Sequence, residues 1–134
     1  MKLSEYAGYD ALGLAELVAR REVSPKELAE TAASAIDAVN PAVNAVVETY
    51  PDRIEDLDER TLGSGPFRGV PFLIKDFFGH EAGRVVEFGS RLCRGVVSPQ
   101  DTHLYEMFKA SGVNVLGRSA APEYSMSGTT ESAL

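Results

Sequence analysis

The sequence predicts an α/β domain in which helices alternate with the strands of a mixed sheet. Three patterns support this prediction. A helical pattern precedes an apolar run at residues 45–47, a second apolar run covers residues 70–74, and a helix, a glycine and a strand follow one another at 104–116. Helices that alternate with strands favour a parallel or mixed sheet. The 134 residues amount to about one domain.

Two helices are expected in the first 40 residues. The first begins after Asp10, whose carboxylate can cap a helix N-terminus. The second has a stronger start signal, because Ser24 can cap, Pro25 suits the first helical position, and Glu27 follows Ser24 by three residues as in a capping box. We expect this second helix to end near residue 39, because an Asn-Pro pair follows at 40–41.

The middle of the chain alternates between readable and unreadable stretches. A strand is expected within residues 43–49 and a short acidic helix at 52–62, whose carboxylates are most simply a solvated face. The Gly-Ser-Gly-Pro loop at 63–66 leads into the strand that ends at Lys75. Residues 79–100 show little periodicity, and loops of that length often contribute to a site.

The last third predicts a helix, a strand and a polar loop. The helix starts at the Ser-Pro-Gln-Asp sequence of 98–101 and stops at Gly112. Its inward side is expected to carry Leu104, Met107, Phe108 and Ser111. A strand follows at 113–116. Residues 122–134 are rich in small hydroxyl side chains, and loops that follow strands in open α/β sheets lie where ligands bind.

Composition excludes several classes of function. Thirteen basic against twenty acidic residues give a net charge of −7, which argues against a nucleic-acid partner. No apolar stretch is long enough to span a bilayer, so no membrane partner is expected. Cys93 is the single cysteine, so no internal disulfide can form, and this suits a reducing cytoplasm.

Metal and cysteine chemistry are poorly supported by the sequence. His80 and His103 are isolated, and no pair of ligands has the spacing of a metal site, so we expect no metal and no other cofactor. A catalytic cysteine would need Cys93 to meet a base such as His103. Nothing in the sequence brings those two side chains together.

The segment Gly-Val-Pro-Phe-Leu-Ile-Lys-Asp at 69–76 places a lysine at the tip of an apolar strand. Burial of a lysine amine disfavours its charged form and lowers its pKa, so that a sheltered lysine can act as a base or nucleophile. The alternative is that Lys75 and Asp76 are simply the polar exit of the strand into a turn. The motif alone leaves both interpretations open.

Several segments follow one another in a specific order along the chain. They are S-P-K-E-L at 24–28, N-P-A-V-N-A-V-V at 40–47, G-P-F-R-G-V-P-F-L-I-K-D at 65–76, D-T-H-L-Y-E-M-F-K-A-S-G-V-N-V-L-G-R at 101–118 and A-P-E-Y-S-M-S-G-T-T-E-S-A-L at 121–134. On these segments the chain, from about residue 10 to its end, resembles the N-terminal part of the amidase signature enzymes.

The resemblance implies a fold, a reaction and site residues. The family fold is a single α/β/α domain around a mixed sheet. Lys75 matches the lysine of a serine, cis-serine, lysine triad that hydrolyses amides through an acyl-enzyme. Ser127, Gly128 and Thr129 match a loop that borders the substrate pocket, and the alternative is a loop that is only held by its own hydrogen bonds. Asp76 is expected to steady the turn after Lys75, and the alternative is that it is simply solvated.

The sequence departs from the family pattern at its end. In the family, a glycine- and serine-rich segment with both catalytic serines follows the stretch that ends here at Leu134. Residues 1–134 are therefore expected to be the N-terminal part of a single, incomplete domain that carries only the lysine of the triad. Such a piece should be inactive alone and poorly stable as a monomer, because apolar strand faces would lack cover.

Two functions from different classes follow. The first is an amidase acting on a small-molecule amide. Residues 87–95 resemble members that act on small or cyclic amides, and the subunit that amidates misacylated tRNA is expected to be a less close relative. The second is a non-catalytic product that associates through exposed strands with its missing half or another copy. A lysine that forms a Schiff base is a third interpretation.

Overall fold

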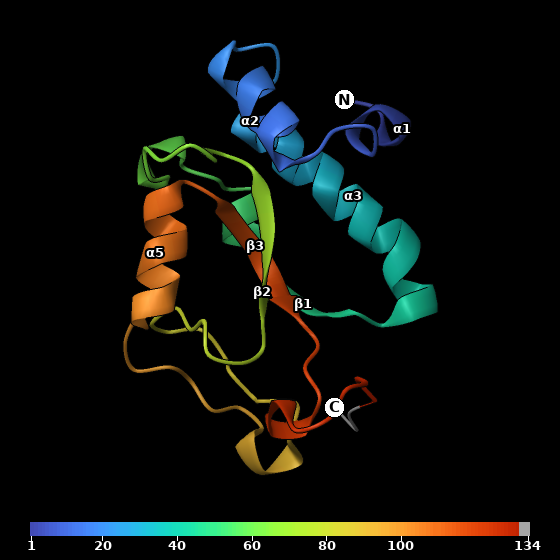
Figure 1. Cartoon of the computed structure of the whole chain (residues 1–134), viewed down its shortest axis with the longest axis vertical. Coiled ribbons are helices and arrows are strands. Elements are labelled where there is room, and N and C mark those ends of the chain that lie inside the picture. Colours follow the sequence, from blue (N-terminus) through green and yellow to red (C-terminus); the bar gives the residue numbers. More distant parts are fainter. Residues whose placement is uncertain (132–134) are drawn as a thin grey trace.

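The computed structural model of the chain describes residues 1–131 (Figure 1). Residues 132–134, which end both the predicted domain and the last segment of the resemblance, lie outside the described residues. In chain order the helices and strands are α1 (Leu3–Tyr6), α2 (Ala11–Ala19), α3 (Pro25–Val43), β1 (Val46–Thr49), α4 (Pro51–Ile54), β2 (Pro71–Lys75), α5 (His103–Ser111) and β3 (Asn114–Ser119). Short 3₁₀ turns lie at Glu59–Thr61, Arg91–Cys93 and Glu123–Ser125.

The three strands form one mixed sheet, as the sequence predicts, and the structure gives their order as β1-β3-β2. Strand β3 lies in the centre, antiparallel to β1 and parallel to β2. The register places Glu48 of β1 opposite Arg118 of β3, and Lys75 of β2 opposite Ser119 of β3. The end of β2 and the end of β3 therefore meet at one edge of the sheet.

Helices α3 and α5 cover opposite faces of this sheet (Figure 1). Leu116 of β3 packs against Ala29 and Ala32 of α3. Its neighbour Val115 points the other way and packs against Tyr105 of α5. Successive side chains of a strand alternate between faces, so one strand supplies both cores. The predicted α/β/α arrangement is confirmed, and α2 adds a further core over α3 through Leu14 and Leu28.

The two helix starts predicted from capping residues are confirmed. The Gly13 amide donates to Asp10 Oδ1 at 2.8 Å, so Asp10 caps α2. The Glu27 amide donates to Ser24 Oγ at 3.1 Å, and Pro25 opens α3. The side chain of Glu27 does not complete a capping box, because it pairs with the amino group of Met1 instead.

Helix α3 is longer than predicted, because the Asn-Pro pair at 40–41 does not end it. The helix continues to Val43 and includes Pro41 in its last turn. A proline there removes one intrahelical hydrogen bond. The Asn40 side chain offsets this loss by bonding the amide and the carbonyl oxygen of Val46, at 2.8 and 2.9 Å. Asn44 then ends the helix in the left-handed conformation.

The acidic helix predicted at 52–62 is also wrong in extent. Only α4 (Pro51–Ile54) and a 3₁₀ turn at Glu59–Thr61 are helical. The intervening carboxylates Glu55, Asp56 and Asp58 are exposed, as expected of a solvated face. Like charges so close together disfavour a continuous helix, and Asp58 instead accepts a bond from the Arg60 amide at 3.0 Å.

The helix predicted to begin at 98–101 begins at His103, with Thr102 as its cap. Its inward face also differs from the prediction. Tyr105 is buried, with 2% of its surface exposed, whereas Leu104 and Met107 are 42% and 58% exposed. Phe108 and Ser111 are half-buried, as expected for that face. The helix packs through Tyr105, which shares a core cluster with Ile74 of β2 and Val115 of β3.

The strands are better covered than the sequence suggested. Residues 114–118 of β3 are all buried, since helices lie on both faces. The outer edges of β1 and β2 stay open, because each of these strands pairs with β3 alone within residues 1–131. Strand β3 also runs beyond residue 116 to Ser119, while β1 is limited to Val46–Thr49. Within the same described residues, no helix is long and apolar enough to cross a membrane.

Candidate active site

Lys75 is the last residue of β2, as the sequence predicts. The residues on either side of it, Ile74 and Asp76, are 7% and 4% exposed, but Lys75 itself is exposed. The shelter from water that the sequence reasoning expected for this amine is therefore not supplied by residues 1–131. The side chain is accessible to any group that approaches the end of β2.

Lys75 lies beside an apolar groove of about 530 Å³ that follows β2. Its walls come from the strand, the turn after it, α5 and the residues after β3. They are Phe72, Leu73, Ile74, Phe77, Phe78, Gly79, Leu104, Phe108, Ser119, Ala120 and Ser125. The Ser125 hydroxyl in this wall is buried and has no hydrogen-bond partner among the described residues.

Ser127 and Thr129, on either side of Gly128, line a different hollow from Lys75. Ser127 and Thr129 border a depression of about 450 Å³ together with Arg91 and Glu131. Ser127 Oγ accepts a bond from the Thr129 amide at 3.3 Å, and all three residues are exposed. The loop is thus held partly by its own hydrogen bonds. That it borders a substrate pocket stays a prediction.

Asp76 holds together two segments that are distant in sequence. One of its oxygens accepts bonds from the Glu87 amide and from Arg118 Nη1, each at 2.9 Å. The other accepts a bond from the Gly89 amide at 3.2 Å. Asp76 therefore steadies the segment at 87–89, and among residues 1–131 its side chain makes no hydrogen bond to the turn that follows Lys75.

Arg118 is the central cation of this cluster, and the sequence analysis missed it. Its side chain is 8% exposed, and its three nitrogens reach Glu48, Asp76 and Glu87 at 2.8, 2.9 and 2.7 Å. Burial opposes the charge of Arg118, but the hydrogen bonds that it donates to these carboxylates raise its pKa. Burial likewise opposes the charge of Glu87, yet its bonds to Arg118 and to the Gly95 amide hold its pKa below the ordinary value.

The long stretch without periodicity forms an irregular but bonded loop. The Val86 amide donates to the Val96 carbonyl at 2.8 Å, and the Ser98 amide donates to the Arg84 carbonyl at 2.9 Å. Val85 and Val97 form an isolated antiparallel bridge. Backbone hydrogen bonds therefore hold this loop together. Such bonds do not depend on side-chain type, so the sequence shows no helical or strand periodicity there.

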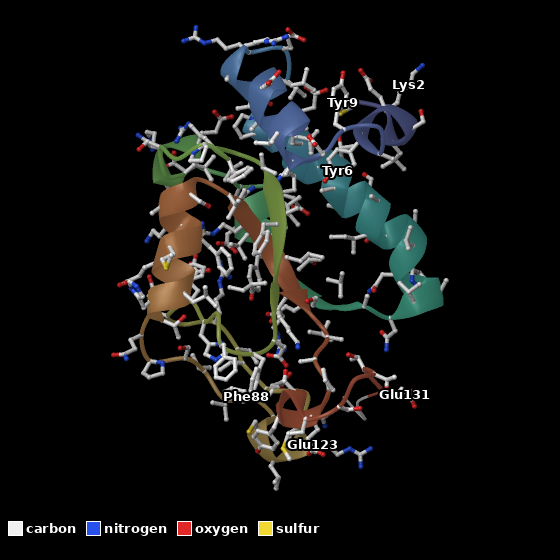
Figure 2. The ribbon with its side chains drawn as sticks, viewed as in Figure 1. Lys2, Tyr6, Tyr9, Phe88, Glu123 and Glu131 are labelled. Atoms are coloured by element: carbon white, nitrogen blue, oxygen red, sulfur yellow. The ribbon has the colours of Figure 1, made fainter. Side chains whose placement is uncertain are left out.

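This loop is also fastened to the segment that leads toward residues 127–129. The Tyr124 amide donates to the Phe88 carbonyl at 2.8 Å, and the two rings stack 6.1 Å apart. Ser90 Oγ donates to a Glu123 carboxylate oxygen at 2.7 Å. Figure 2 shows Phe88 and Glu123 together at the end of the molecule opposite α1 and α2.

The histidines and the cysteine do not assemble with one another in residues 1–131. Cys93 Sγ lies 3.2 Å from the Tyr124 hydroxyl, and His103 is paired with Glu106 at 3.5 Å. Burial lowers the pKa of His80, although the nearby Asp76 opposes this. No group of three or more potential metal ligands occurs among the described residues.

The chain is similar to enzymes that act on amides. It is 34% identical, over 124 residues, to 6-aminohexanoate-cyclic-dimer hydrolase of Paenarthrobacter ureafaciens, an alignment that covers 91% of this chain and 25% of that protein. It is 33% identical, over 124 residues, to a glutamyl-tRNA(Gln) amidotransferase subunit of Thiobacillus denitrificans, covering 88% of this chain and 25% of that protein. These identities do not separate the two groups, so they do not support the expectation that the tRNA-amidating subunit is less close.

Comparison with solved structures finds relatives of the same kind. The structure of 6-aminohexanoate cyclic dimer hydrolase superimposes with a TM-score of 0.84 at 33% identity, covering 93% of this chain and 26% of that one. Peptide amidase from Stenotrophomonas maltophilia superimposes with a TM-score of 0.77 at 27% identity, covering 89% of this chain and 26% of that one. The chain thus spans about a quarter of the length of its relatives. The Amidase family profile matches residues 27–134, and the chain belongs to that family.

Proposed function

We propose that this chain contributes the lysine base of an amide hydrolase, with Lys75 in that role. The observation that carries the proposal is the position of Lys75 at the end of β2, in a chain that belongs to the Amidase family. The buried Ile74 and Asp76 on either side fix the backbone of Lys75, while its amine is left accessible. Such an amine can meet a group supplied by the rest of the domain.

The proposed reaction needs two serines from beyond residues 1–131. A serine hydroxyl is a weak nucleophile until a base removes its proton. In the family pattern, the lysine at the position of Lys75 takes that proton through a bridging serine. The activated oxygen then attacks the amide carbonyl, the leaving amine departs with a proton, and water hydrolyses the acyl-enzyme. We further propose that the loop of Ser127, Gly128 and Thr129 borders the bound amide.

The proposed substrate is a small amide. One of the similar proteins is named as a hydrolase of a cyclic 6-aminohexanoate dimer, and its structure has been obtained with substrate bound. A second relative is named as a subunit of a glutamyl-tRNA(Gln) amidotransferase. Glutamine amide chemistry and cyclic amide hydrolysis are therefore the two reactions to assay first.

The test joins residues 1–134 to the part of a relative that lies outside the alignment with this chain. Residues 1–134 are joined to the remaining part of the Paenarthrobacter ureafaciens hydrolase, about three quarters of that protein. The chimera is assayed on 6-aminohexanoate cyclic dimer and on glutamine. Lys75→Ala is compared with Lys109→Ala, because Lys109 is another exposed lysine, located on α5.

The proposal predicts a working chimera that loses activity with one lysine only. Removal of a general base lowers rates by about 100- to 10,000-fold, so Lys75→Ala should fall in that range while Lys109→Ala keeps the parent rate. Equal activity of the two variants would refute the assignment of Lys75. If borohydride reduction instead attaches a carbonyl substrate covalently to Lys75, the result would favour Schiff-base chemistry.

A second function, association, is favoured by the groove beside β2. Among residues 1–131, strand β2 pairs only with β3, so the outer edge of β2 is unpaired. An unpaired edge is a template for another strand. The adjoining groove is walled by aromatic rings, and Phe78 is 66% exposed there. We propose that this edge binds an apolar strand of a second copy of the chain.

Sedimentation of the chain at several concentrations tests the association. Phe78→Asp should raise the fraction of monomer, since a charge in the groove opposes burial. The matched control is Leu92→Asp, because Leu92 is 86% exposed but does not line the groove. If both substitutions change the monomer fraction equally, the groove is not the site of association.

A further inference from the structure

The guanidinium of Arg118 joins three separate parts of the chain. Its Nε bonds Glu48 of β1, its Nη1 bonds Asp76 after β2, and its Nη2 bonds Glu87 of the loop. The three distances lie between 2.7 and 2.9 Å, which is the range of charge-assisted hydrogen bonds. One side chain thus sets the relative positions of β1, β2 and the loop.

The Asp76 branch of this cluster adjoins Lys75. Asp76 is the next residue in the chain, so its side chain fixes the backbone from which the Lys75 side chain departs. The Asp76 amide also donates to the Ser119 carbonyl at 3.0 Å, which extends the β2–β3 pairing by one residue. With Arg118 on one oxygen and two backbone amides on the carboxylate, Asp76 has little freedom to turn.

The Glu87 branch continues toward the second part of the candidate site. Glu87 Oε1 accepts a bond from the Gly95 amide at 2.9 Å, which closes the loop between 87 and 95. The carbonyl of Phe88 in that loop accepts a bond from the Tyr124 amide. A continuous path of hydrogen bonds therefore runs from Asp76 through the loop to the segment that precedes residues 127–129.

We propose that Arg118 is a positioning residue, which fixes the direction of Lys75 and the place of the 87–95 loop relative to it. The inference rests on the proposed function only in treating Lys75 as the base. A lysine could not replace this arginine in geometry. An ammonium is a single point of charge, whereas the planar guanidinium presents donors in three fixed directions toward three carboxylates.

The experiment uses the chain itself and needs no catalysis, so it can fail independently of the proposed function. Amide hydrogen exchange is measured by NMR for Glu87, Gly89 and Gly95, whose amides donate to the cluster. In parallel, the lysines are dimethylated with a ¹³C label, and the signal of Lys75 is followed. Arg118→Met is compared with Arg60→Met, because Arg60 pairs only with Asp58 among the described residues and is 89% exposed.

Arg118→Met is expected to accelerate the exchange of these amides at least about tenfold and to shift the Lys75 signal. The amides of α3 and the Lys109 signal should stay unchanged, as should every signal in Arg60→Met except those beside residue 60. If Arg118→Met does not fold, Arg118→Lys is judged by the same signals, since it keeps the charge and loses the geometry.

Three results would overturn the inference. The first is an unchanged Lys75 signal in a folded Arg118 variant. The second is uniform acceleration of all amides, including those of α3, because that indicates a general loss of stability rather than positioning. The third is an absence of protection at Glu87 and Gly89 in the unaltered chain, because the cluster would then not form in solution.

Discussion

Gly89 allows the most direct test of how the loop meets the segment after β3. Its φ is +63°, a conformation that costs an L-residue about 1–2 kcal/mol. A Cβ at this position would also collide with the Ala121 carbonyl oxygen and lie 3.1 Å from the carbonyl carbon of Pro122. Both groups are backbone, so they cannot rotate away as the tip of a flexible side chain could.

The matched substitution is at Gly95, in the same loop. Its φ is +74°, but a Cβ there would have nothing within 4 Å. Gly95→Ala therefore carries only the conformational cost, about 1–2 kcal/mol. Gly89→Ala adds the cost of overpacking, typically about 1–3 kcal/mol. The free energy of unfolding should thus fall by about 2–5 kcal/mol for Gly89→Ala.

The assay is urea unfolding monitored by far-UV circular dichroism, at one protein concentration for the unaltered chain, Gly89→Ala and Gly95→Ala. The difference between the two variants isolates the contact of Gly89 with residues 121 and 122. Equal losses of unfolding free energy in the two variants would refute the close approach of the loop to that segment. A loss for Gly95→Ala alone would contradict it more strongly.

The remaining predictions concern the core and the titrating groups. Leu28→Ala should lower the unfolding free energy by about 2–5 kcal/mol, because Leu28 is fully buried. The control Leu12→Ala should change the unfolding free energy by less than about 0.5 kcal/mol in the same urea titration, because Leu12 is 60% exposed. Because the pKa of Glu87 is lowered in the folded chain, its contribution to stability is complete above the ordinary value of 4.5 and is lost as pH falls through the folded pKa. Glu87→Gln should therefore flatten the acid limb of a stability profile measured between about pH 3 and 7, and an unchanged limb would count against the pairing with Arg118. Burial and the neighbouring Glu48 raise the pKa of Tyr50 to about 12, so stability should decline as pH rises from 10 toward that value, and Tyr50→Phe should reduce the decline in alkaline unfolding curves.

Features set by neighbouring residues could be predicted from the sequence. Asp10 and Ser24 are recognised as caps because they act on amides three residues away. The mixed sheet follows from the alternation of helices and strands, and the end of β2 at Lys75 follows from a change from apolar to charged residues. Each of these signals lies within a short window of the chain.

Features that depend on contacts between distant residues could not be predicted from the sequence. The predicted strand ended at residue 116, yet Arg118 lies inside β3 and bonds Glu48, which is 70 residues away in sequence. No local pattern reports a contact of that range. The prediction that the helix ends at 40–41 was wrong for a related reason. The bonds between Asn40 and Val46 that stabilise the last turn form only once the chain has folded back.

The candidate site shows the same division. The place of Lys75 in β2 was predictable, but its exposure was not, since exposure depends on what packs beside the strand. The loop of Ser127, Gly128 and Thr129 was grouped with Lys75 on resemblance, and the two line different hollows in residues 1–131. Whether they face one substrate is a property of the assembled domain.

A crystal structure of the chimera that carries residues 1–134 would show directly whether Lys75 meets a serine. We expect Lys75 Nζ within hydrogen-bond distance, about 2.7–3.2 Å, of a serine hydroxyl supplied by the added part, and out of contact with bulk water. A Lys75 amine that still projects into solvent in the complete domain, with both serines elsewhere, would contradict it.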